Sequence, residues 1–418
     1  MRPIMTNVKP PSSSNTVYDI LALIGLLLSL SAAITFVLSQ SSAAAAASSP
    51  IIMNGSDAHF NTFSSAGISY DTQNMTHRSA KAEWQPHRAQ SAMSREWWYV
   101  TALLHDASGK QYMLFTIILK FDGKDIKAMP QMAAMLGPST TILSPQVALS
   151  NYNTGFHYSD SDIALVNPKQ IWNSKTNTLS YKTPHYTGSW SFNGQNMTAV
   201  LKSQKMVYDL SMLGANQIMW AKDRTYNKEG FIQEGLPGNV SFYYSLPRLM
   251  VFGKLSYVDE SGSNKTIDVV GQGWVDRQWG DIKTNAWEWA SFRFDNGARL
   301  NLYSFENGHK VGTYQKQDGS LQWIDNFTIR QNGYDKAPNG QWVSFGWSYD
   351  FPTNVEGSMR YTVVPFSKND WICSLSFCLI SAAGQLVNDT TGKQVGSSIN
   401  ESMDIRILKN GPYNVNQH

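Results

Sequence analysis

Three evenly spaced turn signals in the C-terminal half constrain the fold of this chain more than any other feature. Gly297, Gly308 and Gly319 end the turn sequences Asp-Asn-Gly, Glu-Asn-Gly and Asp-Gly, and segments of similar length separate them. Asn-Gly and Asp-Gly supply the positive φ angles that tight type I′ hairpin turns need. Apolar and polar residues alternate in between, as in strands with one buried face. The pattern predicts an up-and-down antiparallel meander, and closure into a barrel would remove its edges.

Composition extends this reading to the whole chain. The chain has 418 residues, more than one ordinary domain, so two domains are expected. Aromatic residues make up 12% and charged residues 16%, a balance that suits strands better than helical bundles. The net charge is +3 and no segment concentrates Lys and Arg, so no nucleic-acid partner is expected.

An uncharged apolar segment near the N-terminus predicts contact with a membrane. Ile20–Leu38 carries no charge and is about as long as one transmembrane helix. Arg2 and Lys9 precede it, while residues 40–76 contain no Lys or Arg, which places the N-terminus in the cytoplasm and the rest outside. We expect a single-pass protein of the cell membrane, held by residues 20–39, or a secreted protein after cleavage in the Ala/Ser run that follows. An uncleaved anchor is favoured.

Sequons agree with export. The chain has eight Asn-x-Ser/Thr sequences, which are typical of an exported glycoprotein, although chance matches in an Asn-rich chain are the alternative. They begin at Asn54, Asn74, Asn196, Asn239, Asn264, Asn326, Asn388 and Asn400.

The only two cysteines, Cys373 and Cys378, could form a disulfide in an oxidising compartment. A straight strand would hold them too far apart, so pairing needs a turn near residues 374–376. Two buried free thiols are the alternative.

Three sequence blocks carry a resemblance to a known family. Gly271–Gly280 reads GQGWVDRQWG and is followed by Trp287-Glu-Trp289 and the hairpin FDNGARLNLYSF; Arg95–Val100 reads REWWYV, and Phe242–Arg248 reads FYYSLPR. In this order the blocks resemble the motifs of the AttH-like and carotenoid 1,2-hydratase family. The C-terminal third matches only in its general β character.

The resemblance implies an all-β fold of two lipocalin-like antiparallel β-barrels packed together, here preceded by one N-terminal transmembrane helix. Some relatives hydrate the terminal double bond of carotenoids, some assist pericyclizations, and many are called secreted hydrolases without a defined reaction. We therefore expect a hydrophobic small molecule (isoprenoid, carotenoid or lipid) as partner. The expected organisation is a cytoplasmic N-terminus (1–19), a transmembrane anchor or signal (20–39), a Ser/Ala/Asn-rich tether (40–80), an N-terminal barrel (81–283) and a C-terminal barrel (284–418).

Asp276 is the first candidate catalytic residue. A carboxyl group packed among indoles loses water, which raises its pKa and keeps it protonated closer to neutral pH. It could then protonate an alkene, and aromatic faces could stabilise the carbocation before water attacks. The aromatic side chains in question are Trp274, Trp279, Trp287 and Trp289. Alternatively, Asp276 is a hydrogen-bonded core residue or pairs with Arg277 or Arg248.

Glu96 and His157 are further catalytic candidates. Glu96 lies in an alternating strand and points either into the barrel or to solvent; a structural ion pair with an arginine is the alternative. His157 could accept a proton or position water, and its alternative is a hydrogen-bonded core or surface residue. The remaining residues expected to line the site are Trp97, Trp98, Tyr99 and Tyr244.

Some absent motifs narrow the function. The chain has no G-x-S-x-G, no H-E-x-x-H and no complete dinucleotide fingerprint, so neither a cofactor nor a metal is expected. The working hypothesis is an exported protein that binds a long isoprenoid or polyene and hydrates a C=C bond by general-acid catalysis. A non-catalytic carrier of lipid or pigment and a pericyclase-like isomerase or cyclase are the alternatives.

Overall fold

The computed structural model describes the chain in segments between residues 63 and 404. They are residues 63–65, 68–70, 79–87, 94–122, 141–167, 169–223, 228–233, 240–281, 286–305, 308–336, 342–373 and 378–404. Within them the chain is all-β, with two large sheets and one separate hairpin, β1 (Phe63–Ser65) and β2 (Ile68–Tyr70). A single 3-10 turn, η1 (Ala82–Trp84), precedes the larger sheet.

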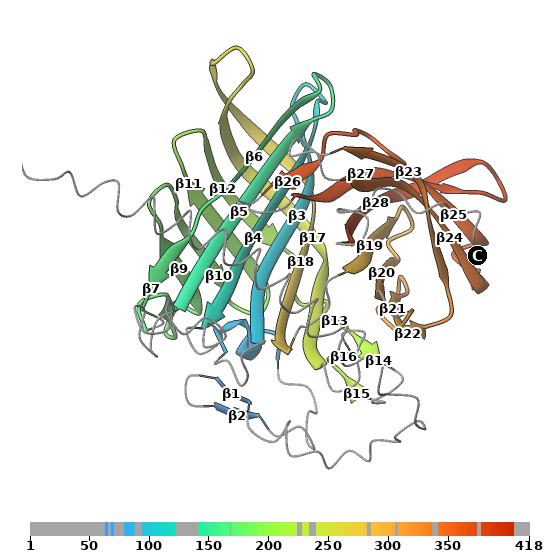
Figure 1. Cartoon of the computed structure of the whole chain (residues 1–418), viewed down its shortest axis with the longest axis horizontal. Helices are drawn as coiled ribbons and strands as arrows, with labels where there is room; N and C mark the ends of the chain where they lie inside the picture. Colours follow the sequence, from blue (N-terminus) through green and yellow to red (C-terminus); the bar gives the residue numbers. More distant parts are fainter. Residues whose placement is uncertain are drawn as a thin grey trace, which may run out of the picture. The chain divides into compact units, whose positions relative to one another are not determined.

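The larger sheet holds sixteen strands: β3 (Ser94–Asp106), β4 (Gln111–Asp122), β5 (Thr141–Asn151), β6 (Phe156–Ser161), β7 (Ala164–Val166), β8 (Trp172–Asn173), β9 (Thr178–Lys182), β10 (Thr187–Phe192), β11 (Asn196–Lys202), β12 (Met206–Leu213), β13 (Met219–Trp220), β14 (Lys222–Asp223), β15 (Lys228–Glu229), β16 (Phe231–Gln233), β17 (Val240–Val258) and β18 (Asn264–Asp281). The main hydrogen-bonded order is β6-β5-β4-β3-β18-β17-β12-β11-β10-β9-β8, and its neighbours are antiparallel. Figure 1 shows this sheet curling around one face. Among the described residues its two ends, β6 and β8, do not pair, so it forms a curled half-barrel; closure into a full barrel stays a prediction.

The smaller sheet holds ten strands: β19 (Ala286–Phe294), β20 (Arg299–Phe305), β21 (Lys310–Gln315), β22 (Leu321–Ile324), β23 (Thr328–Lys336), β24 (Trp342–Val355), β25 (Ser358–Pro365), β26 (Trp371–Cys373), β27 (Cys378–Asn388) and β28 (Lys393–Asp404). Its order is β22-β21-β20-β19-β28-β27-β25-β24-β23, and β26 pairs with β27. Every strand up to Asp281 belongs to the larger sheet or the hairpin, and every strand from Ala286 onward belongs to the smaller sheet.

The predicted meander is confirmed in β19 to β22. These strands pair in sequence order, and their connections contain Gly297, Gly308 and Gly319 at φ angles of 93°, 83° and 88°. Such angles suit glycine because other side chains rarely adopt them. The local turn chemistry therefore sets the register of this half of the smaller sheet.

Three groups of buried apolar side chains hold the two sheets. The first lies on the concave side of the larger sheet and includes Trp98, Tyr244 and Trp279. The second covers one face of the smaller sheet. The third joins both sheets, because it combines Tyr99 and Trp274 of the larger sheet with residues such as Trp289 of the smaller one. The side chains packed between the sheets thus come from the faces that point away from the other two cores.

The N-terminal part of the prediction lies mostly outside the described residues. The expected cytoplasmic segment 1–19 and the anchor or signal 20–39 lie wholly outside them, and of the expected tether 40–80 only the β1–β2 hairpin and residues 79–80 are described. In the described part of the chain, no helix has the length and apolar character needed to cross a membrane.

The cysteines lie at the facing ends of two neighbouring strands. Cys373 ends β26 and pairs in register with Cys378, which begins β27. Cys373 is disulfide-bonded, and Cys378 is the only other cysteine of the chain. The alternative of a free thiol therefore does not hold for Cys373.

Candidate functional site

The alternation of side chains along β18 divides the Gly271–Gly280 block into two faces. Asp276 and Trp274 point toward the smaller sheet, where the Trp274 indole donates a 2.6 Å hydrogen bond to the Asp276 carboxylate. Arg277 and Trp279 point to the concave side of the larger sheet. The two tryptophans that flank Asp276 in sequence therefore lie on opposite faces, and only Trp274 contacts its carboxyl group.

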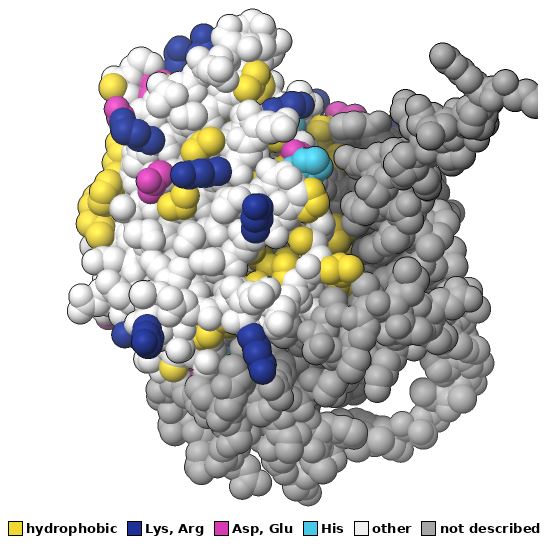
Figure 2. All heavy atoms as spheres, turned by 90° about the vertical axis from the view of Figure 1, so that its left-hand side faces the viewer, with side chains coloured by type: hydrophobic (Ala, Val, Ile, Leu, Met, Phe, Trp, Pro, Cys, Tyr) yellow, Lys and Arg dark blue, Asp and Glu magenta, His cyan; other side chains and the backbone are white. Residues whose placement is uncertain are grey.

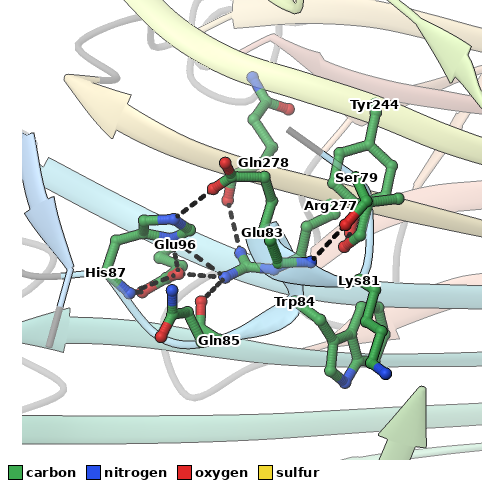
Figure 3. Close-up of polar contacts among 12 residues, drawn as sticks. Ser79, Lys81, Glu83, Trp84, Gln85, His87, Glu96, Tyr244, Arg277 and Gln278 are labelled. Atoms are coloured by element: carbon green, nitrogen blue, oxygen red, sulfur yellow. Dashed lines mark hydrogen bonds and ion pairs between the residues drawn. The ribbon is translucent and has the colours of Figure 1, made fainter. Parts of the chain in front are cut away.

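On the concave side, Glu96 lies in a buried ion cluster (Figure 3). Its carboxylate accepts a hydrogen bond from Arg277 and lies 2.8 Å from His87 Nδ1 and 3.3 Å from Lys120 Nζ. His87 Nε2 in turn lies 3.1 Å from Glu83. Burial alone would raise the pKa of Glu96, but the charges of Arg277, Lys120 and His87 hold it well below its ordinary value. A carboxyl group that stays ionised is a poor proton donor, so this cluster is best described as structural.

The cluster fastens residues 79–87 to the larger sheet. Trp279 stacks on the His87 ring with centroids 4.2 Å apart. Side chains of four different strands donate hydrogen bonds to backbone carbonyls of this segment: Trp98 to Trp84 (2.9 Å), Lys120 to His87 (2.6 Å), Tyr244 to Ala80 (2.9 Å) and Arg277 to Gln85 (2.7 Å). Trp98, Tyr244 and Trp279, which were predicted to line a binding site, thus hold the polypeptide chain itself.

Asp276 lies on the other face, between the two sheets. Its Oδ1 accepts hydrogen bonds from Ser245 Oγ at 2.7 Å and from Trp274, and Tyr243 lies 2.8 Å from the same serine hydroxyl. Burial raises the pKa of Asp276 to about 6, and the hydrogen bonds from Ser245, Tyr243 and Trp274 limit the rise. Asp276 is 3% exposed and contacts neither Arg277 nor Arg248.

Glu401 of β28 brings a second carboxyl group to the same layer. Burial raises its pKa to about 8, and the charge of Asp276 contributes to the rise. Tyr99 of β3 lies near both carboxyl groups. Burial raises the pKa of its hydroxyl, and the charges of Glu401 and Asp276 raise it further. Because the two carboxyl groups interact, ionisation of one makes the other hold its proton more readily than an isolated carboxyl group does.

Aromatic side chains surround this carboxyl pair. The Trp289 ring lies 5.6 Å from Tyr99 and 6.4 Å from Trp274, both edge to face. Trp97 and Trp287 pack at the margin of the same group. Hydrogen bonds also cross between the sheets here, from Asn301 to the Tyr243 hydroxyl (3.1 Å) and from the Tyr303 hydroxyl to Gln278 (3.1 Å).

His157 belongs to a separate network. Its Nδ1 lies 2.9 Å from Ser150 Oγ and its Nε2 lies 2.7 Å from the Trp371 carbonyl, and Ser150 donates a 2.6 Å hydrogen bond to Asp370. Burial lowers the pKa of His157 and raises that of Asp370 to about 6. The network ties β5 and β6 to β26, and no described contact links it to Asp276.

The structure therefore separates the predicted site residues into three places. Asp276 shares the layer between the sheets with Trp97, Tyr99, Trp274, Trp287 and Trp289, whereas Glu96, Trp98, Tyr244 and Trp279 lie on the concave side and His157 lies apart. Glu401 was not predicted, because it lies in the C-terminal third beyond the recognised motifs. His87 was not predicted either; it precedes the first strand of the larger sheet.

The described residues contain no cluster of three or more His, Cys, Asp or Glu side chains arranged to hold a metal ion.

Solved structures share this fold at low sequence identity. A protein of Nitrosomonas europaea assigned to AttH superposes with a TM-score of 0.58 and 16% identity, over 75% of this chain and 94% of that one. Kievitone hydratase from Nectria haematococca superposes with a TM-score of 0.56 and 12% identity, over 83% of this chain and 98% of that one. None of the curated proteins matches the chain in sequence. At such identities the likeness concerns the fold alone.

The family assignment rests on the sequence itself. The model of the AttH-like family matches residues 82–378, which is well over half of the chain and includes all three motif blocks together with the strands that carry Asp276 and Glu96. The chain therefore belongs to the AttH-like family.

Proposed function

We propose that this protein is a cofactor-independent hydratase that adds water across a C=C bond of an isoprenoid or other polyene between its two sheets. The observation that carries the proposal is the pair of buried carboxyl groups, Asp276 and Glu401, contributed by different sheets and both shifted upward in pKa. A buried pair of acids with different pKa values can divide the roles of proton donor and proton acceptor.

The pKa values assign the roles. Near pH 7 Glu401 is mostly protonated and donates a proton to one alkene carbon, while Asp276 is mostly ionised and accepts a proton from the attacking water. The new C–H and C–O bonds use the electrons of the C=C bond and of water, so no oxidant or reductant is needed. Tyr99, close to both carboxyl groups, returns the proton from Asp276 to Glu401 and restores the starting state.

The aromatic layer supports the same chemistry. Protonation of a substituted alkene leaves a carbocation, which the faces of Trp274 and Trp289 stabilise through their π electrons. The proposal changes the role first expected for Asp276, because a pKa of about 6 suits a base at neutral pH better than an acid. Fold similarity to kievitone hydratase, a protein named for adding water, is compatible with this chemistry.

We further propose that the protein is exported and glycosylated, held by residues 20–39 or released after cleavage. The apolar N-terminal segment supports this, together with three exposed sequon asparagines, Asn196, Asn264 and Asn326.

The test compares turnover and binding in single variants. Isoprenoid alkenes are incubated with the full chain in isotopically labelled water, and incorporation of the label is followed by mass spectrometry. Asp276→Asn and Glu401→Gln should each lower turnover by about 100-fold or more and leave the substrate dissociation constant nearly unchanged. Asp370→Asn is the matched control, because Asp370 is also buried with a pKa raised to about 6 but lies in the separate His157 network. Binding without turnover in the unaltered protein would instead identify a carrier.

A further inference from the structure

A buried arginine in the same layer has no carboxylate partner among the residues that the structure describes. Arg293 of β19 is 1% exposed, and within this part of the chain its guanidinium donates hydrogen bonds only to two hydroxyls, Thr101 Oγ1 and Ser291 Oγ, each at 3.2 Å. It also lies over the Trp274 ring, 5.4 Å from the centroid. Its Nε has no hydrogen-bond partner among the described residues. A guanidinium with so few partners is costly to bury, because charge removed from water needs compensation.

A second arginine adds to this positive charge. Arg299 of β20 is 8% exposed and donates hydrogen bonds to the backbone carbonyls of Pro247 (3.0 Å), Phe294 (3.1 Å) and Ala298 (2.8 Å). Burial, together with the charge of Arg299, lowers the pKa of Arg293 to about 9. Within the described residues, no carboxylate oxygen lies within 4 Å of either guanidinium. The charge of Asp276 acts on Arg293 from a greater distance, and the charge of Asp295 acts on Arg299.

The incompletely paired guanidinium points to a bound polar group. Buried polar groups are nearly always hydrogen-bonded, and the Arg293 Nε is a buried donor without a hydrogen-bond partner among the described residues. The nearby hydroxyls of Tyr99 and Ser381, in contrast, already interact with Glu401. Because the unpaired atom of Arg293 is a donor, the expected ligand atom is an oxygen.

We propose that the molecule bound between the sheets is an unsaturated organic acid, whose carboxylate is held by Arg293 and whose apolar chain lies against Trp274 and Trp289. The location of the site rests on the proposed function, but the ligand class rests on the arginines. A carboxylate matches the guanidinium in charge and hydrogen-bond geometry.

The test uses two fluorescent polyenes that differ only in charge, cis-parinaric acid and its methyl ester. Each is titrated into the full chain at pH 7, and dissociation constants are taken from the rise in polyene fluorescence. The acid should bind about 10- to 100-fold more tightly than the ester, the range expected for hydrogen bonds to a charged group. Arg293→Met should remove this preference, and Arg293→Lys should retain part of it because the charge remains.

A surface arginine supplies the control. Arg330 of β23 is 60% exposed and pairs with Asp350, so Arg330→Met should keep the full preference for the acid. Equal affinity of acid and ester in the unaltered protein would overturn the ligand class. This outcome does not depend on whether any variant folds. That result would leave the hydratase proposal intact, because its test depends on Asp276 and Glu401 and on turnover. Conversely, tighter binding of the acid than of the ester without any turnover in the unaltered protein would support the ligand class and contradict the hydratase proposal.

Discussion

Replacing Glu96 by glutamine removes one negative charge from the concave cluster and keeps the shape of the side chain. Arg277, Lys120 and His87, each no more than 4% exposed, then lose the carboxylate that they share, while Glu83 stays 3.1 Å from His87. Breaking a buried ion pair by removing one partner costs about 3–5 kcal/mol, because the remaining charge stays buried. We expect Glu96→Gln to lower the free energy of unfolding at pH 7 by about 3–5 kcal/mol.

The same substitution should change the pH dependence of stability. The folded-state pKa of Glu96 lies well below its ordinary value, so the unfolded chain binds a proton more readily than the folded one. The stabilising contribution of Glu96 is therefore complete above the unfolded pKa of about 4.3 and is lost as the pH falls below it, toward the folded pKa. The unaltered protein should lose stability in this acidic window, and Glu96→Gln should lose less.

Urea unfolding followed by tryptophan fluorescence measures both effects, at pH 7 and at pH 4. The control is Asp268→Asn, which breaks the pair of Asp268 with Lys254; their side chains are 79% and 66% exposed and lie 2.7 Å apart. This exposed pair should contribute less than about 1 kcal/mol. If Glu96→Gln were as stable as the control at pH 7, or lost stability in acid as steeply as the unaltered protein, the cluster would not be the structural ion site described here.

Two further predictions concern other parts of the chain. Gly271→Ala should destabilise the fold by about 3 kcal/mol in the same urea assay, because an added Cβ would lie 2.0 Å from the Leu103 carbonyl oxygen of the neighbouring strand; unchanged stability would contradict this packing. In a secretory host, peptide mapping should find glycans on the exposed Asn196, Asn264 and Asn326 but not on Asn388 and Asn400, which are 4% and 0% exposed; a glycan on Asn400 of folded protein would show that β28 is not buried as described.

Local chemistry explains which parts of the fold were predictable. The meander follows from turn glycines and from the alternation of apolar and polar residues, and both signals act over only a few residues. The structure has this meander in β19 to β22, where it was predicted. The curl of the larger sheet depends instead on pairing between β3 and β18, strands more than 150 residues apart in sequence. No local pattern encodes such pairing, so the prediction of two closed barrels rested on the family resemblance, and the structure has two antiparallel sheets, the larger one a curled half-barrel.

The candidate site was predictable only in part, for a related reason. Side chains alternate along a strand, so Asp276 and Trp274 had to share one face and Arg277 and Trp279 the other. The prediction placed Asp276 beside both Trp274 and Trp279 because all three are close in sequence, and this was wrong for Trp279. Glu401 joins Asp276 only because β28 pairs with β19 and the smaller sheet packs on the larger one. Glu96 forms the structural ion pair with an arginine that was the alternative to a catalytic role. Its partner, Arg277, lies on β18, the neighbour of β3 in the sheet.

Direct titration of the two carboxyl groups tests the central claim most directly. Infrared difference spectra between pH 5 and pH 9 report the loss of protonated carboxyl groups, and Asp276→Asn and Glu401→Gln assign the bands. The account predicts that one carboxyl group, absent from Glu401→Gln, stays protonated at pH 7 and titrates near pH 8, while another, absent from Asp276→Asn, titrates near pH 6. Spectra in which both groups are already ionised at pH 5 would contradict it.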